Sequence, residues 1–433
     1  MRKFLLNDLI SRETAVDKLI KYWDVQSNVE IIKLEDSLGR VSSMDIFSIN
    51  SLPVYRASMA DGIAVRKSDF KNGLPDTSNW VKNKDYAQAD TGDDFPDEFD
   101  CVVRIEDVSF DGERPIFTTT MSVFEIDNIR QCGKTITKGE LILKKDTKIS
   151  EMQLVTLAAG GIEKLSVYKK PRVIFIPTGN ELVPRGTVPA RGKNIESNSI
   201  MVKAMLEKMG AEFICYDIVK DDIKQLSDAV ERALNDGDII IICAGSAKGE
   251  EDYTHVVLNK YGKVLQHGIL TVPGRPTGFA IAKNKPIINI PGPTLGAYCA
   301  VDLCIAPLID KLLHQGREKR EIIKITLGHD IKTSGVMEFI IRMNVIEKAG
   351  IIIGNSVPFT ASLPTIARDC NALLFVPIGV KGYKKGQQVE VELLHGRKNL
   401  SVNEVEHEHA NKEKFPKRVS VKGISGKSKK HIR

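Results

Sequence analysis

Four short polar or glycine-bearing segments, each directly after an apolar run, contain most of the residues that could do chemistry in this chain. They are residues 177–181, 220–222, 244–253 and 291–294. If the apolar runs are strands of one parallel sheet, the segments meet at its carboxyl edge, where such sheets bind ligands. Their small residues let backbone N–H groups approach a ligand, and helix N-termini behind them favour phosphate. Because carboxylates beside a phosphate need a cation between them, the pattern predicts a phosphorylated ligand with Mg²⁺.

A simpler interpretation of the four segments is that they are ordinary turns between strands and helices. Their carboxylates would then only cap the helices that follow, although the convergence of all four segments is hard to obtain from capping alone. The loop that contains Gly245, Ser246 and Gly249 matches neither G-x-G-x-x-G nor the Gly-Lys-Ser/Thr of a P-loop. A dinucleotide-dependent dehydrogenase and a P-loop NTPase are therefore disfavoured.

The elements that would position these segments alternate between strand and helix from residue 171 onwards. The runs RVIFIPTG, EFICYDIV, DIIIICAG and PIINIPG are unbroken apolar strands. Helical periodicity follows Ser197, extends from Ile223 to Leu234, and returns from Leu295 to Leu313. Alternation of this kind predicts a parallel sheet that is covered by helices on both faces.

The other regions of the chain have different patterns. Residues 1–48 are predicted to be helical, with Ser11 as an N-cap, and a further helix begins at Ser150. Short β-like runs separated by Gly, Pro and Asp fill residues 49–144, and strand-like runs return in residues 318–394. We therefore predict a multidomain α/β protein with a three-layer α/β domain. The predicted parts are an N-terminal helical linker domain (1–48 plus 145–170), an inserted β-rich domain (49–144), the α/β domain (171–317), a small C-terminal β domain (318–395) and a basic disordered tail (396–433).

The composition is that of an ordinary globular protein. The chain has 433 residues, of which 42% are hydrophobic and 27% charged. No apolar run approaches the ~18 residues that span a bilayer, and Asp8 interrupts the only N-terminal apolar stretch. We therefore expect a cytoplasmic protein without a membrane partner. The seven cysteines form no C-x-x-C pair, which argues against zinc and iron–sulfur sites and favours reduced, buried thiols.

The basic character of the chain is confined to its end. Residues 396–433 contain eleven Lys and Arg against four Asp and Glu, within a net charge of +6 for the whole chain. This tail could be an interaction arm or a solvated segment. It has one aromatic residue, Phe415, so base stacking is not supported and no nucleic-acid partner is expected. His407 and His409 could bind a metal only weakly in such a segment.

Several motifs, in order and in register, resemble the molybdopterin molybdenumtransferase family over residues ~10–394. LPVYRASMADGIAV at residues 52–65 resembles the family's LPPFDNSAMDGYAV, and the Asp90-Thr91-Gly92 region resembles TGAPLPEGADAVV. Further matches are NIR at 128–130, TGNEL at 178–182, ESN at 196–198, the Gly249 to Thr254 stretch, PGRP at 273–276 and Pro291-Gly292. Several independent motifs in register are more specific than any one of them.

The resemblance implies a fold and an activity. The family, which includes the bacterial and archaeal MoeA proteins and the gephyrin E domain, inserts molybdenum into molybdopterin. Its members use adenylylated molybdopterin, molybdate and Mg²⁺, and they release AMP. They are four-domain homodimers in which the inserted β domain of one subunit faces the α/β molybdopterin-binding domain of the other. The resemblance therefore predicts a transferase of molybdenum cofactor biosynthesis that acts as a homodimer.

The resemblance also assigns roles to individual residues. Asp61 and Glu181 would be the carboxylates nearest the metal and the pyrophosphate, and Asp252 and Asp222 would complete the acidic set, with Asp61, Glu181 and Asp252 as the metal ligands. Arg275, where the family usually has Lys, would offset anionic charge through a planar fork rather than a point charge. The positions expected to bind the cofactor are Thr91, Arg130, Thr178, Gly179, Gly245, Ser246, Gly249, Arg275, Pro291 and Gly292.

The chain departs from the family pattern inside the expected site, which indicates a divergent branch. Lys134-Thr135 follows Gly133 where the family has an acid, Val272 replaces a lysine, and residues 291–296 have lost an Asn and a Ser. Lys248 could replace the lost charge or be a solvated loop lysine. An alternative function therefore stays open, a non-catalytic paralogue that binds molybdopterin or molybdate as a carrier or sensor. The oxyanion could be molybdate or tungstate, since the two have nearly the same size and charge.

Overall fold

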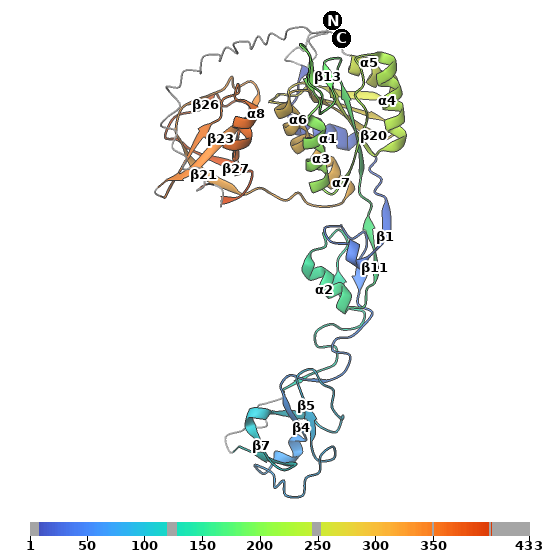
Figure 1. Ribbon diagram of the computed structural model, residues 1–433, viewed down its shortest axis with the longest axis vertical. Coiled ribbons are helices and arrows are strands. Elements are labelled where there is room, and N and C mark those ends of the chain that lie inside the picture. Colours follow the sequence, from blue (N-terminus) through green and yellow to red (C-terminus); the bar gives the residue numbers. More distant parts are fainter. Residues whose placement is uncertain (1–7, 119–127, 245–252, 349, 398–399, 401–433) are drawn as a thin grey trace, which may run out of the picture. The chain divides into compact units, whose positions relative to one another are not determined.

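The structure, a computed structural model, describes residues 8–118, 128–244, 253–348, 350–397 and 400. The chain divides into two compact units, Met1–Glu318 and Lys319–Arg433, and each is described separately (Figure 1). Among the described residues, none of the helices combines the length and the apolarity that crossing a membrane requires.

A six-stranded sheet forms the centre of the first unit, in the order β15-β12-β16-β20-β19-β17. Neighbours among the first four strands are parallel, and their apolar sequences match the buried strands that the periodicity predicts. The fold class predicted from the sequence is confirmed. The strands are β12 (Arg172–Thr178), β15 (Glu212–Cys215), β16 (Ile239–Ala244), β17 (Lys263–His267), β19 (Gly278–Ala282) and β20 (Lys285–Pro291).

The prediction of an all-parallel sheet is wrong at one strand. β19 runs antiparallel to both of its neighbours, β20 and β17. Only Lys283 and Asn284 separate β19 from β20, and both have positive φ, 48° and 58°. Two residues cannot form the long crossover that a parallel pair requires, but two positive-φ residues suit a tight hairpin turn. The sheet is therefore mixed at this end.

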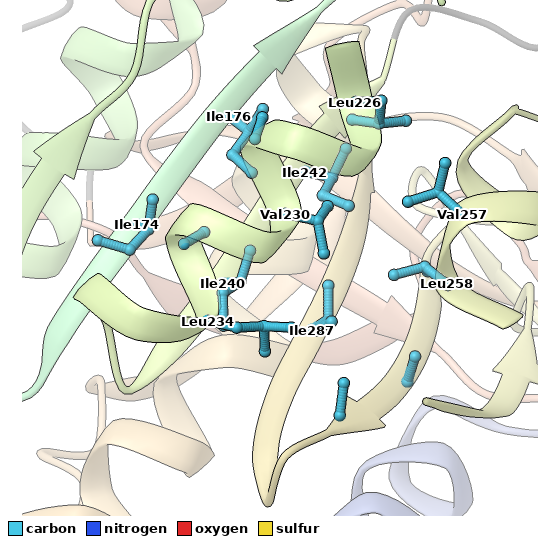
Figure 2. Close-up of a cluster of buried hydrophobic side chains, with 14 residues drawn as sticks. Ile174, Ile176, Leu226, Val230, Leu234, Ile240, Ile242, Val257, Leu258 and Ile287 are labelled. Atoms are coloured by element: carbon cyan, nitrogen blue, oxygen red, sulfur yellow. The ribbon is translucent and has the colours of Figure 1, made fainter. Parts of the chain in front are cut away.

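Helices cover both faces of the sheet, as predicted (Figure 1). On one face, α4 (Ile223–Asp236) and α5 (Tyr253–Tyr261) pack against isoleucines of β12, β16 and β20, and Figure 2 shows this cluster. On the other face lie α1 (Arg12–Tyr22), α3 (Asn198–Lys208) and α6 (Thr294–Ala300). The helix predicted over residues 295–313 is interrupted by a π-helical stretch, Val301–Ile305, before α7 (Ala306–Leu312). This gives the three layers that the sequence predicts.

The prediction that residues 1–48 are helical is wrong beyond α1. Ser11 caps α1, as predicted, by accepting a hydrogen bond from the Thr14 N–H. Residues 29–33 instead form strand β1 (Val29–Lys33), which pairs with β11 (Lys164–Tyr168) in an antiparallel ribbon. Its exposure alternates along VEIIK with a period of two, which is a strand pattern rather than a helical one. The linker region also contains η2 (Leu34–Asp36), the paired strands β2 (Ile46–Phe47) and β10 (Leu141–Leu143), and the predicted helix, α2 (Glu151–Ala159).

The inserted region is built from short strands around a three-stranded sheet, in the order β5-β4-β6. Apolar side chains pack on both of its faces, including Ile63 and Val103 on one and Ala64 and Val102 on the other. The β-rich character that the sequence predicts is confirmed. Its elements are β3 (Ala57–Ser58), β4 (Gly62–Val65), η3 (Lys67–Phe70), β5 (Ala87–Ala89), β6 (Cys101–Arg104), η4 (Ile105–Asp107), β7 (Val108–Asp111), β8 (Arg114–Phe117) and β9 (Ile129–Arg130).

The second unit is a small β barrel. Five strands close on themselves in the order β23-β24-β21-β27-β25, because β25 pairs with both β27 and β23. Alternate residues of these strands fill the interior, among them Ile325, Met343 and Val391. The elements are β21 (Ile322–Leu327), β22 (Ile331–Lys332), β23 (Glu338–Lys348), β24 (Ile351–Ser356), α8 (Leu363–Asp369), β25 (Ala372–Val376), β26 (Gly382–Tyr383) and β27 (Gln388–Leu393). Residues 401–433, which hold most of the predicted tail, lie outside the described residues.

Candidate active site

The carboxyl ends of three neighbouring strands lie side by side in register. Thr178, the last residue of β12, pairs with Ala244 of β16, and Ala244 pairs with Pro291 of β20. On the other side, Thr178 forms an isolated bridge with Val219, just before the acidic pair at 221–222. The predicted convergence of the segments after these strands is therefore confirmed for their first residues. Gly245, Ser246, Gly249 and Asp252, which are predicted site residues, lie outside the described residues.

Asp221 joins two of the four segments through hydrogen bonds. Its carboxylate accepts from the Thr178 hydroxyl at 3.3 Å and from the Asn180 N–H at 3.2 Å. In return, the Asp221 N–H donates to the Asn180 side-chain oxygen at 3.3 Å. The neighbouring Asp222 instead caps α4, by accepting from the Gln225 N–H at 2.8 Å. The capping interpretation therefore describes Asp222, whereas Asp221 is the acid that contacts the end of β12.

Glu181 lies at the turn that follows β12. A side chain at Gly179 would come within 2.7 Å of a Glu181 carboxylate oxygen, so the carboxylate lies directly against the glycine. The backbone carbonyl of Glu181 accepts from the Asn194 N–H at 2.8 Å, where the two-stranded ribbon of β13 (Leu182–Val183) and β14 (Asn194–Ile195) begins. Lys193 donates to the Asn180 carbonyl at 2.6 Å. The ribbon therefore holds the turn while the Glu181 carboxylate remains partly exposed.

The turn at residues 291–296 is packed against two other segments. The Asn198 side chain donates to the Gly292 carbonyl at 2.7 Å. A Cβ at Gly296 would lie 2.9 Å from the Cβ of Pro291 and 3.8 Å from the Gly274 N. The loop of Gly274 and Arg275 is thus adjacent to the turn after β20. Arg275 is half-buried, and no hydrogen bond or ion pair links its guanidinium to another described residue.

Asn289 is a buried polar residue that the sequence did not single out. It lies two residues before Pro291 on β20, so the two side chains share a face of the sheet. Its neighbours in register are Ile242 and Gly278. Its side-chain oxygen is buried, and in the described part of the chain it has no hydrogen-bond partner. An unsatisfied buried acceptor costs about 1–3 kcal/mol, which a ligand that donates a hydrogen bond there would recover.

A second group of predicted residues lies in the inserted region. The Thr91 N–H donates to an Asp61 carboxylate oxygen at 2.7 Å. This hydrogen bond and one from the Thr91 side chain lower the pKa of Asp61 below its usual value, although the carboxylate is exposed to solvent. The Gly92 N–H donates to the Ser58 carbonyl at 2.9 Å, which holds the two loops together. Arg130 follows on β9, paired with Ala57, with an exposed side chain.

The predicted residues thus form two sets, each joined by hydrogen bonds or strand register. Thr178, Gly179, Pro291 and Gly292 lie at the sheet edge, whereas Asp61 and Thr91 contact each other in the inserted region. No cluster of three or more His, Cys, Asp or Glu side chains that could hold a metal ion occurs in the described part of the chain. The sequence does not distinguish Asp221 from Asp222, because both follow Lys220 after the apolar run that ends at Val219.

Two family models match consecutive parts of the chain. The MoeA N-terminal region, described as domains I and II, matches residues 10–161, and a model described as "Probable molybdopterin binding domain" matches residues 174–311. The second match covers the central sheet from β12 to α7, and it contains every described residue of the sheet-edge set.

Whole-chain relatives agree with these matches. A molybdopterin molybdenumtransferase of Staphylococcus epidermidis is 28% identical over 403 residues, which cover 89% of this chain and 95% of the relative. That of Haemophilus influenzae is 28% identical over 72% of this chain and 80% of its own. The crystal structure of the molybdopterin biosynthesis MoeA protein from Pyrococcus horikosii superposes with a TM-score of 0.74 at 26% identity, covering 90% of this chain and all of that one. The chain therefore belongs to the MoeA family, with the MoeA N-terminal region followed by the molybdopterin-binding domain.

Proposed function

We propose that this protein is a molybdopterin molybdenumtransferase, which inserts molybdate or tungstate into adenylylated molybdopterin and releases AMP in a Mg²⁺-dependent reaction. The observation that carries the proposal is the register of Thr178, Ala244 and Pro291 at one sheet edge. This edge lies within the match to the molybdopterin-binding domain. Parallel strands of a mixed sheet that end together provide the crevice in which such folds bind ligands.

The described residues of this edge suit a pterin with a charged side chain. The buried oxygen of Asn289 would accept a hydrogen bond from a pterin N–H, which is the partner it lacks among the described residues. Arg275, half-buried beside the turn at 291–296, would offset the charge of the phosphates. The reaction needs little covalent help from the protein, because holding the oxyanion next to the dithiolene sulfurs is catalysis by proximity.

The carboxylates that are present fit a magnesium ion. Mg²⁺ is held in proteins by one or two carboxylates, with waters and substrate phosphates completing its shell, so it does not require a cluster of three acids. The hydrogen bonds from Thr91 lower the pKa of Asp61 and so favour its charged form, and Glu181 is partly exposed at the sheet edge. We propose that Asp61 and Glu181 hold the ion with Asp252, and that the ion offsets charge on the pyrophosphate as AMP leaves.

A homodimer would bring the two sets of residues to one site, with Asp61, Thr91 and Arg130 of one subunit facing the sheet edge of the other. The ribbon of β1 and β11 supports a second copy of the chain as the partner. It has only two strands, and on it Val29 and Ile31 are 56% and 74% exposed. Apolar side chains in such a position favour coverage by another surface. Sedimentation of the protein, with Ile31→Glu as the disruptive variant, tests the dimer.

A non-catalytic binding protein is the second candidate, and the turn after β20 favours it. Gly296, which stands where the family has Ser, leaves no room for a side chain, because its Cβ would lie 2.9 Å from that of Pro291. A hydroxyl that could contact an oxyanion is thus absent, and the turn is closed instead. Thr135 and Val272 also replace charged residues of the family pattern. Binding without turnover would agree with this candidate.

The test is AMP release from adenylylated molybdopterin with Mg²⁺ and either molybdate or tungstate. Oxyanion-dependent release that is lost in Asp61→Asn and Glu181→Gln would establish the transferase and identify the metal it inserts. Asp222→Asn is the matched control, since Asn caps a helix about as well as Asp. If Asp222 only caps α4, this variant keeps its activity. Tight ligand binding with no AMP release from the unmodified protein would instead support the carrier or sensor.

A further inference from the structure

The inserted region contains a cavity that none of the roles above uses. Its volume is about 250 Å³, a little below the ~300–1,000 Å³ typical of drug-sized ligand sites, and it is partly open to solvent. Its walls come from the three-stranded sheet, from the β7–β8 hairpin and from the loop around Lys82. The cavity is therefore formed entirely within the inserted region, and no second domain is needed to complete it.

The cavity is lined by aromatic side chains and by a side-chain amide that is available for hydrogen bonding. Tyr86 is buried and its hydroxyl donates to the Glu113 carbonyl, which fixes its ring in the wall. Phe110 is 44% exposed, with its ring centroid 6.4 Å from that of Tyr86. The exposed Gln88 also lines the cavity, and its amide has no hydrogen-bond partner among the described residues. Such walls suit a flat, nitrogen-rich ring that stacks on an aromatic side chain and pairs with an amide.

The charges in the cavity favour an uncharged ring over a phosphate. Asp90 and Glu113 line it together with one cation, Lys82. The two carboxylates would repel a phosphate inside the cavity, whereas an exocyclic amine can donate to them. The phosphate of a nucleotide would thus remain at the mouth of the cavity and its base would enter.

The cavity borders the Asp61–Thr91 pair. Gly62 and Asp90, which both line it, are the chain neighbours of Asp61 and Thr91. Ile105, another lining residue, donates its N–H to the Asp61 carbonyl at 2.8 Å. A nucleotide whose base occupied the cavity would therefore have its phosphate near the carboxylate that the proposed function gives to the metal.

We propose that this cavity binds the adenine base of the adenylylated substrate. The inference rests on the proposed function, because that substrate carries two flat heterocycles, a pterin and an adenine. The pterin is assigned to the sheet edge within residues 174–311, which leaves the adenine for the inserted region. A glutamine amide forms two hydrogen bonds with adenine, to N6 and N7, and Gln88 is placed to make them.

Fluorescence of Trp80 reports on the cavity without any turnover. Trp80 stacks on Tyr86, with 6.5 Å between ring centroids and an angle of 23°. Trp23 is the other tryptophan of the chain, so the full-length Trp23→Phe variant leaves Trp80 as the only reporter. AMP, GMP and 6-hydroxymethylpterin are each titrated into this protein. We expect AMP to change the emission at lower concentration than either of the others.

Two substitutions of the wall should weaken AMP binding. Phe110→Leu removes a base–aromatic contact and Gln88→Leu removes the hydrogen bonds of the amide. Each loss is worth about 1 kcal/mol or more, so each should raise the Kd for AMP at least about fivefold. Ile116→Ala is the matched control, since Ile116 lies on the same hairpin with 42% exposure and does not line the cavity. Circular dichroism confirms that each variant is folded.

The outcomes separate this inference from the proposed function. AMP binding that depends on Phe110 and Gln88 supports the cavity even if no transferase activity is found. Normal AMP release with an unchanged KM and Kd in both wall variants would retain the transferase and overturn the adenine site. Preferential binding of the pterin probe would also overturn it, because the cavity would then take the other ring.

Discussion

Replacing Gly62 with alanine should separate two strands of the inserted region. Gly62 begins β4 and pairs with Arg104 of β6, next to the pair of Ile63 and Val103. A Cβ at Gly62 would lie 2.9 Å from the Val103 carbonyl carbon and 3.0 Å from the Arg104 Cα, and nearer still to the Val103 oxygen. Carbon atoms in contact prefer about 3.5–4.0 Å, so the backbone must move by at least roughly 0.5 Å.

The loss of stability in Gly62→Ala can be worked out from the contacts that this shift disturbs. Two hydrogen bonds of the β4–β6 ladder at this end contribute about 1 kcal/mol each. Forcing an extra methyl group into a packed position costs about 1–3 kcal/mol more. Gly62→Ala should therefore lower the free energy of unfolding of the inserted region by roughly 3–5 kcal/mol. With an m-value of about 2 kcal/mol/M, the urea midpoint of this region falls by about 2 M.

Trp80 fluorescence in the Trp23→Phe background measures this unfolding locally, because Trp80 packs on Phe117 in the same core. Gly316→Ala is the matched control. Gly316 has no positive φ, and a Cβ there would meet nothing within 4 Å. It should unfold within about 0.5 kcal/mol of the parent protein. A Gly62→Ala protein with the parent midpoint would refute the reasoning, since the strands would then have room that the structure does not give them.

Three further predictions concern the α/β domain and the inserted region. Leu234→Ala, in the core of Figure 2, should cost about 2–5 kcal/mol of stability, measured by thermal unfolding, and a loss under 1 kcal/mol would contradict the packing. Burial raises the pKa of the Cys243 thiol to about 12, so at pH 8 a maleimide should label the exposed Cys132 in the folded protein and Cys243 only after unfolding. Thr91→Pro removes the backbone donor that lowers the pKa of Asp61, so this pKa should rise towards its usual value. The acid limb of the pH profile of AMP release should then shift to higher pH. Thr91→Val keeps that N–H and should shift the limb less, and equal shifts in both variants would assign the effect to the hydroxyl.

Much of the α/β fold could be predicted because periodicity reports which faces are buried. The run VIFIP is apolar throughout and lies in β12, buried on both faces, whereas the helical period of Ile223 to Leu234 gives the single buried face of α4. Periodicity does not report the direction of a strand. Nothing in the run GFAIA distinguishes a parallel from an antiparallel strand, and the signal for β19 lies in the two-residue turn at Lys283 and Asn284.

The candidate site was predictable as a region and less so residue by residue. The convergence of segments follows from strand direction, but the two adjacent acids at 221 and 222 are equivalent in the sequence. The geometry distinguishes them, since Asp222 caps α4 and Asp221 bonds to Thr178. Asn289 was not selected, because one polar residue inside PIINIPG looks like a strand residue until its unpartnered oxygen is seen.

The position of helix α1 determines what a truncation of the N-terminal residues would do. It is separated from the sheet it covers by the linker and inserted regions, yet Lys18 donates to the Leu265 carbonyl at 2.6 Å. Asp24 and Asn284, 260 positions apart, exchange two hydrogen bonds at the tip of the β19–β20 hairpin. Helix α1 is therefore synthesised long before the strands that it contacts, and contacts of this range slow folding. Removing the first 25 residues would uncover the central sheet, far from the cut in sequence, while leaving the inserted β region its own core.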